Sequence, residues 1–91
     1  MDDTWDARAW VASVLGCNRS DLTVRSRNEG FETGTQVRYD MKGKQAARLI
    51  VAGPIRTLNG EPEGHWVIAL ELPDRTTRSA PHVPESKTIL F

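Results

Sequence analysis

The chain has 91 residues, of which 38% are hydrophobic and 26% are charged, and its formal net charge is zero. This length supports one modest hydrophobic core and excludes two independent domains, and the composition is that of a folded protein rather than a disordered one. No apolar run approaches the ~18 residues that span a bilayer, and the acidic start at residues 1–3 is unlike a secretory signal. The sequence therefore predicts a cytoplasmic protein with no membrane segment.

The first predicted element is an amphipathic helix over residues 4–15. Asp3 and Asp6 have the spacing of a capping box at its start, and Gly16 is a typical stop. Apolar residues recur at helical spacing between them: Ala7, Trp10, Val11, Val14 and Leu15. Trp5 lies off this stripe, which leaves two interpretations open. Either it packs at the sheet edge or the helix entrance, or it is exposed and anchors a partner, since Trp is enriched in interface hot spots.

Four later segments have the alternation of apolar and polar residues, or the β-branched runs, that are typical of β-strands. They cover residues 22–26, 35–41, 45–52 and 65–72. A polar loop is predicted over 28–34, Lys42-Gly43 is predicted as a hairpin turn, and Gly53-Pro54 as a break before a short strand over 55–58. Residues 44–49 also have good helix propensity, but the β-branched run that follows them favours a strand.

The two central predicted strands, 45–52 and 65–72, carry apolar residues on both of their faces. A sheet that is apolar on both sides has to be covered on both sides. The single helix covers one side, so the other is left to the C-terminal tail, to a second copy of the chain or to another protein. The tail ends in Ile89, Leu90 and Phe91. It either folds back onto the uncovered face, which is favoured because burying three such side chains stabilises by a few kcal/mol, or acts as a docking peptide.

Together these elements predict an α+β fold. One N-terminal helix packs on an antiparallel sheet of four to five strands in meander order. Residues 1–75 are expected to form the domain, and residues 76–91 an extended tail that docks back or contacts a partner, because Pro81 and Pro84 restrict this segment to extended conformations.

No motif for catalysis, metal binding or phosphate binding is present. The lone Cys17 excludes an internal disulfide and a cysteine zinc site, and the negative end of the preceding helix makes it a poor nucleophile. His65 and His82 lack a nearby third ligand at zinc-site spacing, and the glycines lack the phosphate-loop pattern. We therefore expect a protein that is not an enzyme and that has no cofactor, metal or small-molecule substrate.

The first functional hypothesis is a protein-binding module. The small size and the absence of motifs suggest an inhibitor, immunity or accessory protein, encoded by a phage or another mobile element and acting on a host complex. It would bind a protein partner or a second copy of itself, as a homodimer, through the second sheet face, aromatic anchors and an acidic loop. The candidate contact residues are Trp5, Glu61, Glu63, Ile89, Leu90 and Phe91.

The alternative hypothesis is a nucleic-acid-binding domain. Residues 19–56 carry eight basic and four acidic side chains, a balance of +4 in a neutral chain. Tyr39 or Phe31 could stack on a base beside the basic residues. The basic candidates are Arg25, Arg27, Arg38, Lys42, Lys44 and Arg48. The neutral total and the absence of a nucleic-acid-binding signature favour the protein-binding hypothesis.

Overall fold

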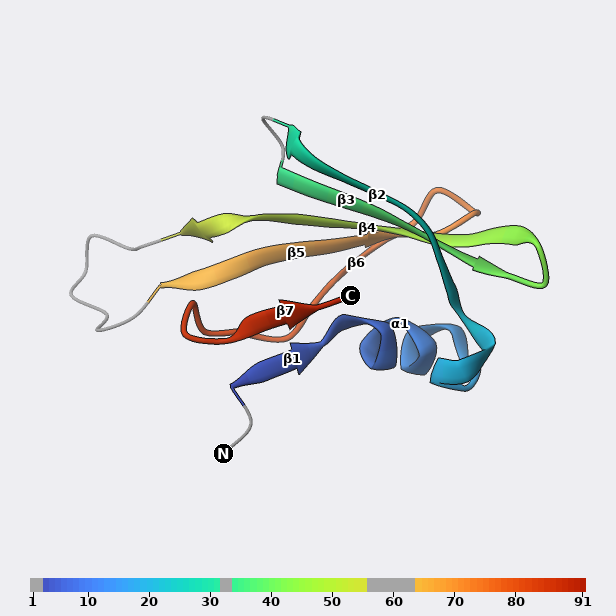
Figure 1. The fold of residues 1–91 in the computed structure, drawn as a ribbon, viewed down its shortest axis with the longest axis horizontal. Helices are drawn as coiled ribbons and strands as arrows, with labels where there is room; N and C mark the ends of the chain where they lie inside the picture. The colour runs from blue at the N-terminus through green and yellow to red at the C-terminus, as the bar shows by residue number, and fades with distance from the viewer. Residues whose placement is uncertain (1–2, 32–33, 56–63) are drawn as a thin grey trace.

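The computed structural model describes residues 3–31, 34–55 and 64–91 (Figure 1). Within these ranges the predicted α+β fold is confirmed, because one α-helix packs on a five-stranded antiparallel sheet of order β2-β3-β4-β5-β6. The elements are β1 (Thr4–Asp6), α1 (Ala7–Leu15), the 3₁₀ turn η1 (Arg19–Asp21), β2 (Thr23–Phe31), β3 (Gly34–Met41), β4 (Lys44–Ile55), β5 (His65–Glu71), β6 (Thr77–Ser79) and β7 (Thr88–Leu90). No helix in the described ranges has the length and apolar character needed to cross a membrane.

The helix begins three residues later than predicted. Residues 4–6 form strand β1 instead of a first helical turn, and Asp6 has an extended backbone and accepts a hydrogen bond from the Ala9 N–H at 3.0 Å. Asp6 is therefore the N-cap, in place of the predicted Asp3. The prediction was wrong here because β1 pairs in parallel with β7 at the other end of the chain, and no local pattern signals such a partner. The helix ends at Gly16, as predicted, with a left-handed φ of 74°.

The hairpin between β3 and β4 is confirmed. Lys42 and Gly43 both have positive φ, 54° and 77°, as a two-residue type I′ turn requires. Residues 44–49 lie in β4, so the helical alternative for this segment is wrong. The positive φ at both turn positions matches the right-handed twist of the two strands, and this match fixes the register of the hairpin.

Two predicted interruptions are strands in the structure. β2 runs through Phe31, where a loop was predicted over 28–34, because it stays paired with β3 to the Phe31↔Gly34 position. β4 runs through the predicted break at Gly53-Pro54 to Ile55, with a register irregularity after Ala52. The rest of the predicted 55–58 strand lies outside the described residues.

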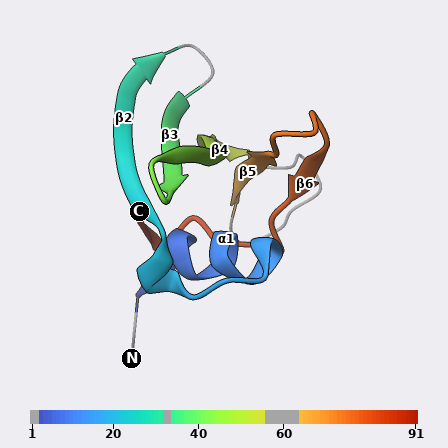
Figure 2. The ribbon, with the colours of Figure 1, turned by 90° about the vertical axis from the view of Figure 1, so that its right-hand side faces the viewer.

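The molecule has two layers. Helix α1 and the β1–β7 pair lie on one side of the five-stranded sheet, and the sheet curves over the helix (Figures 1 and 2). We call the face toward this layer the inner face and the opposite one the open face. The hydrophobic core lies between the layers, and its largest fully buried side chains are Tyr39, Leu49, Leu70, Val11, Val37 and Val83.

The C-terminal segment 76–91 is part of this architecture. β6 adds a fifth strand beside β5, and β7 pairs with β1, with Trp5 opposite Ile89. The segment folds back, but on the same side of the sheet as α1. The prediction that it covers the second face is wrong, because pairing with β1 holds β7 in the inner layer (Figure 1).

Candidate functional site

Strand register assigns each sheet residue to the inner or the open face. In β4 the buried side chains Ala47, Leu49 and Val51 belong to the inner face, and the residues that alternate with them belong to the open face. No helix or further strand of the described residues lies over the open face (Figures 1 and 2). The residues on this face include Ser26, Asn28, Gln36, Arg38, Arg48, Ile50, Ala52, Val67, Ala69, Glu71, Thr77 and Ser79.

An apolar stripe crosses the open face along β4 and β5. It consists of two neighbouring cross-strand pairs, Ile50 with Ala69 and Ala52 with Val67. Val67 is 37% exposed, and the other three side chains are half-buried. The sequence prediction of apolar residues on both faces of these strands is therefore confirmed, and this chain leaves the second set in contact with solvent.

The β2–β3 side of the open face is polar and hollowed. One hollow of about 250 Å³ adjoins a second of about 440 Å³, and Arg38 lines both. The Arg38 Nε donates to the Asp40 carboxylate at 2.7 Å, and Arg48 lies opposite Glu71 in the register. The first hollow is also lined by Ser26, Asn28, Gln36, Gln45 and Arg48, and the second by Thr23, Arg25, Asp40 and Gly43. Charges of both signs therefore flank the apolar stripe.

The structure separates the basic residues of the nucleic-acid hypothesis. Arg38 and Arg48 belong to the open face, and Arg25 borders it. Arg27 lies opposite Val37 on the inner face, where its guanidinium lies over the Phe91 ring at 4.4 Å. Lys42 and Lys44 are exposed at the β3–β4 turn. Tyr39, proposed as a stacking residue, is fully buried, and the side chain of Phe31 lies outside the described part of the structure.

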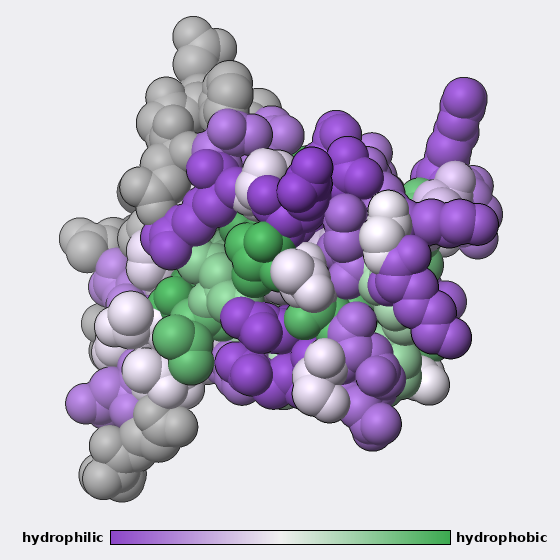
Figure 3. All heavy atoms as spheres, turned by 45° about the vertical axis from the view of Figure 1, so that its right-hand side comes forward, coloured by the Kyte–Doolittle hydropathy of each residue, from purple (hydrophilic) through white to green (hydrophobic). Residues whose placement is uncertain are grey.

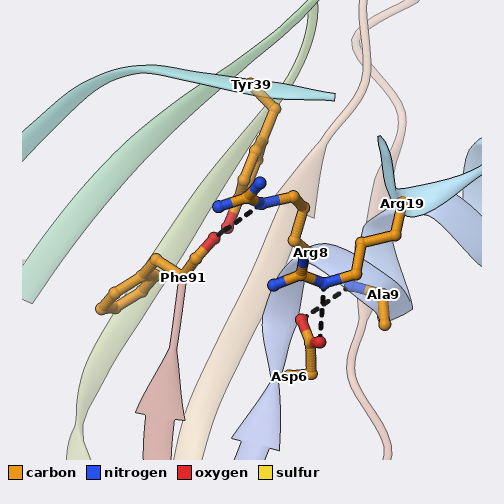
Figure 4. Close-up of polar contacts among 6 residues, drawn as sticks. All are labelled: Asp6, Arg8, Ala9, Arg19, Tyr39 and Phe91. Atoms are coloured by element: carbon orange, nitrogen blue, oxygen red, sulfur yellow. Dashed lines mark hydrogen bonds and ion pairs between the residues drawn. The ribbon is translucent and has the colours of Figure 1, made fainter. Parts of the chain in front are cut away.

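The end of the chain is anchored on the inner layer rather than displayed. The Tyr39 hydroxyl and the Arg8 Nε both donate to the main-chain oxygen of Phe91, at 3.1 and 3.2 Å (Figure 4). The Trp66 Nε1 donates to the Lys87 carbonyl at 3.0 Å. Ile89 and Phe91 are partly buried against the core, and Leu90 is 48% exposed. The structure thus brings Ile89 and Phe91 into the fold and leaves only Leu90 of the three available to a partner.

Tyr39 ties the core to this C-terminal anchor. Burial of its hydroxyl raises the pKa of Tyr39 from 10.0 to about 12, and the Arg8 guanidinium opposes this rise. Because the pKa of Tyr39 is higher in the folded state than in the unfolded chain, the protonated hydroxyl contributes to stability, and this contribution is fully present below pH 10. That contribution is lost as the pH rises through about 12, because the unfolded chain releases its proton first.

We expect Tyr39→Phe to lower the free energy of unfolding by about 1 kcal/mol at neutral pH, since the hydrogen bond to Phe91 is lost. Between pH 10 and about 12, however, the wild type is expected to lose up to roughly 2–3 kcal/mol that the variant does not lose. Urea unfolding of both proteins across this pH range measures the difference. The two proteins differ in no other ionisable group, so parallel pH profiles would contradict the assignment to Tyr39.

Of the remaining protein-binding candidates, the structure describes Trp5. Trp5 is half-buried in β1, and its ring packs against Trp10 with the centroids 5.8 Å apart. This contact favours the interpretation in which Trp5 packs at the helix entrance. Glu61 and Glu63 lie outside the described residues.

The structure brings His65 and His82 together, which no sequence pattern indicated. The rings of His65 and His82 lie 4.9 Å apart, because an antiparallel bridge joins His65 to Pro84. The Nδ1 atom of His65 is buried and has no hydrogen-bond partner. In the described ranges no third His, Cys, Asp or Glu completes a metal-binding group around the two histidines. Cys17 is a half-buried free thiol.

Comparisons with protein-family models, curated proteins and solved structures find no match to this chain.

Proposed function

We propose that the protein is a small binding module whose open sheet face contacts another protein, a second copy of the chain being the first case to test. The single observation that supports this function is the apolar stripe of Ile50, Ala52, Val67 and Ala69 on a face without cover. Association buries such side chains, and each buried CH₂ group contributes about 0.8 kcal/mol.

The surroundings of the stripe also suit a protein partner. Protein interfaces combine an apolar centre with a polar rim that hydrogen-bonds and fixes the orientation of the partner. Here Arg48 and Glu71 lie beside the stripe, and the hollowed surface around Arg38 offers guanidinium and amide groups. In a two-fold homodimer, Arg48 of each copy could face Glu71 of the other, so this pair of opposite charges is compatible with self-association.

The same geometry gives less support to nucleic-acid binding. A phosphate-tracking surface needs a continuous set of cations, and sequence-tolerant single-strand binding also needs exposed aromatic rings. Arg27 lies on the other face, Arg38 is paired with Asp40, and no aromatic side chain occurs among the open-face residues named above. We also propose that the protein is not an enzyme, that it is cytoplasmic, and that it acts as an inhibitor or accessory protein.

The decisive experiment compares two charge insertions at matched exposed side chains. Val67 and Leu90 are both large, apolar and exposed, but only Val67 belongs to the open face. Light scattering after size exclusion gives the oligomeric state, and capture from extracts of the native host identifies a different protein partner. We expect Val67→Glu to weaken the association at least about tenfold, because burial of an unpaired carboxylate is costly, and Leu90→Glu to leave it unchanged.

Three results would contradict this proposal. The first is equal binding by wild type and Val67→Glu, and the second is loss of binding only with Leu90→Glu. The third is a monomer that retains generic DNA or RNA at ~50 mM salt and releases it steeply by ~200 mM, which would favour the nucleic-acid alternative. Circular dichroism of both variants checks that the substitutions leave the fold intact.

A further inference from the structure

A second surface of the molecule, which contains no residue of the apolar stripe, is a groove of about 440 Å³ at the end of the sheet. It lies between the β3–β4 turn and the last residue of α1, and its wall is mainly apolar. This volume is within the range of pockets that hold a small ligand or a large side chain. The lining residues are Leu15, Met41, Lys42, Lys44, Gln45, Ala46 and Pro73. Figure 3, coloured by the hydropathy of each residue, shows hydrophobic surface left of centre and at the right, bordered in both places by hydrophilic residues.

A β-bulge shapes the floor of the groove. Tyr39 pairs with Ala47, whereas the next residue, Asp40, pairs with Gln45, so Ala46 is an extra residue in β4. A bulge breaks the strict alternation of a strand, and here the consecutive residues Ala46 and Ala47 are both buried. Met41 also lines the groove, and its unbranched, polarizable side chain adapts to differently shaped apolar groups.

The rim of the groove is positively charged. Lys42 and Lys44 are both exposed, and the lining contains no acidic residue. The nearest acids in the sequence have other partners. Asp40 is held by Arg38 at 2.7 Å, and Asp74 accepts from the Thr76 hydroxyl at 2.6 Å, which keeps the pKa of Asp74 below its usual range. The two ammonium groups are therefore placed to meet negative charges of another molecule.

We propose that this groove binds an acidic peptide segment of a partner protein. One hydrophobic side chain of the segment inserts between Leu15, Met41 and Ala46, and flanking carboxylates contact Lys42 and Lys44. Insertion removes apolar surface from water, and the lysines select against basic sequences and fix the direction of the peptide. Of the lining residues, Gln45 also lines a hollow of the open face, but none belongs to the apolar stripe, so this site does not depend on the function proposed for that stripe.

The test is an NMR titration of the ¹⁵N-labelled full chain with short glutamate-rich peptides that carry one central leucine, phenylalanine or tryptophan. With at least one of these peptides, we expect saturable shifts at Leu15, Met41 and Ala46, with affinity falling as salt rises. Replacing the central residue by serine should weaken binding at least about tenfold, and replacing the glutamates by lysines should abolish it. No shift at these residues with any peptide up to about 1 mM would overturn the proposal.

Matched charge removals separate the two surfaces. The double variant Lys42→Gln/Lys44→Gln should bind the peptide roughly 2- to 30-fold more weakly. The double variant Arg25→Gln/Arg48→Gln, which removes the same charge beside the open face, should bind as the wild type does. If both double variants weaken peptide binding equally, the attraction is nonspecific electrostatics and the proposed site is contradicted. Shifts at the groove that depend on protein concentration without peptide would assign it to a second copy and overturn the proposed occupant. If the open-face association is not observed but peptide still shifts the groove residues, the open-face proposal fails and the groove proposal stands.

Discussion

Replacing Gly34 by alanine is expected to destabilise the protein by about 3 kcal/mol or more. Gly34 has a φ of 95°, and a Cβ atom at this position would lie 2.0 Å from the Val51 carbonyl oxygen and 2.9 Å from the Ala52 Cα. These atoms belong to the backbone of β4, so a side-chain rotation cannot relieve the overlap. The β3 and β4 backbones would have to separate at the point where Thr35 pairs with Val51. Urea unfolding at neutral pH measures the loss.

Gly53→Ala is the control for this experiment. No atom within 4 Å would meet a Cβ at Gly53, and its φ lies outside the left-handed region. The same chemical change should therefore alter the free energy of unfolding by less than about 1 kcal/mol. Similar losses in the two variants would mean that the close approach of β3 and β4 at Gly34 does not hold in solution.

The second large effect is expected at Leu49. Its side chain is fully buried on the inner face, where Leu49 pairs with Val37 on one side and Leu70 on the other. Leu49→Ala leaves a cavity between neighbours that are held by two strands, and it should cost about 2–5 kcal/mol. For a chain of this size, that loss lowers the melting temperature by roughly 4–8 °C per kcal/mol, which calorimetry resolves.

Ile50→Ala is the matched substitution on the opposite face. Ile50 is half-exposed, and its cross-strand partners are Gln36 on β3 and the small Ala69 on β5, so its truncation should cost about 1 kcal/mol or less. If Ile50→Ala proved as costly as Leu49→Ala under conditions in which the protein self-associates, the open face would be buried in the folded assembly. A larger loss at Ile50 in the monomer would contradict the assignment of inner and open faces.

The local elements could be predicted because each has a local cause. Strand β3 follows from the alternation of its side chains, β4 and β5 follow from their β-branched and apolar runs, and the turn follows from Gly43, which tolerates positive φ. The end of α1 follows from Gly16. In each case the residues that determine the element lie within it or next to it, so the pattern in the sequence is sufficient.

The side to which a residue points could be predicted only where the alternation is unbroken. Unbroken alternation with Val24 in β2 and with Val37 and Tyr39 in β3 would place Arg25, Arg27 and Arg38 on the same face, yet Arg27 belongs to the inner face. The reason is a register shift between Val24 and Ser26 that leaves Arg25 without a partner of its own. One extra residue in a strand moves every later side chain to the other face. The residue types around Arg25 do not predict this bulge.

The course of the C-terminal segment and the groove depend on contacts between distant parts of the chain. Ile89-Leu90-Phe91 was correctly expected to fold back, but its side of the sheet is decided by pairing with β1. The groove brings Leu15, Met41 and Pro73 together from three separate segments. The sequence showed two lysines at the turn, but the apolar wall beside them requires the tertiary structure.

The bulge at Arg25 has a consequence for the solubility of the sheet. β2 is nine residues long, and among the described strands its only sheet neighbour is β3, so β2 is an edge strand of this sheet. Long, regular edges act as templates for strand addition between molecules and lead to fibrous aggregates. An irregular step at Arg25 and the positive charges of Arg25 and Arg27 interrupt this template. The same local distortion that turns Arg27 inward therefore also protects the edge against fibre growth.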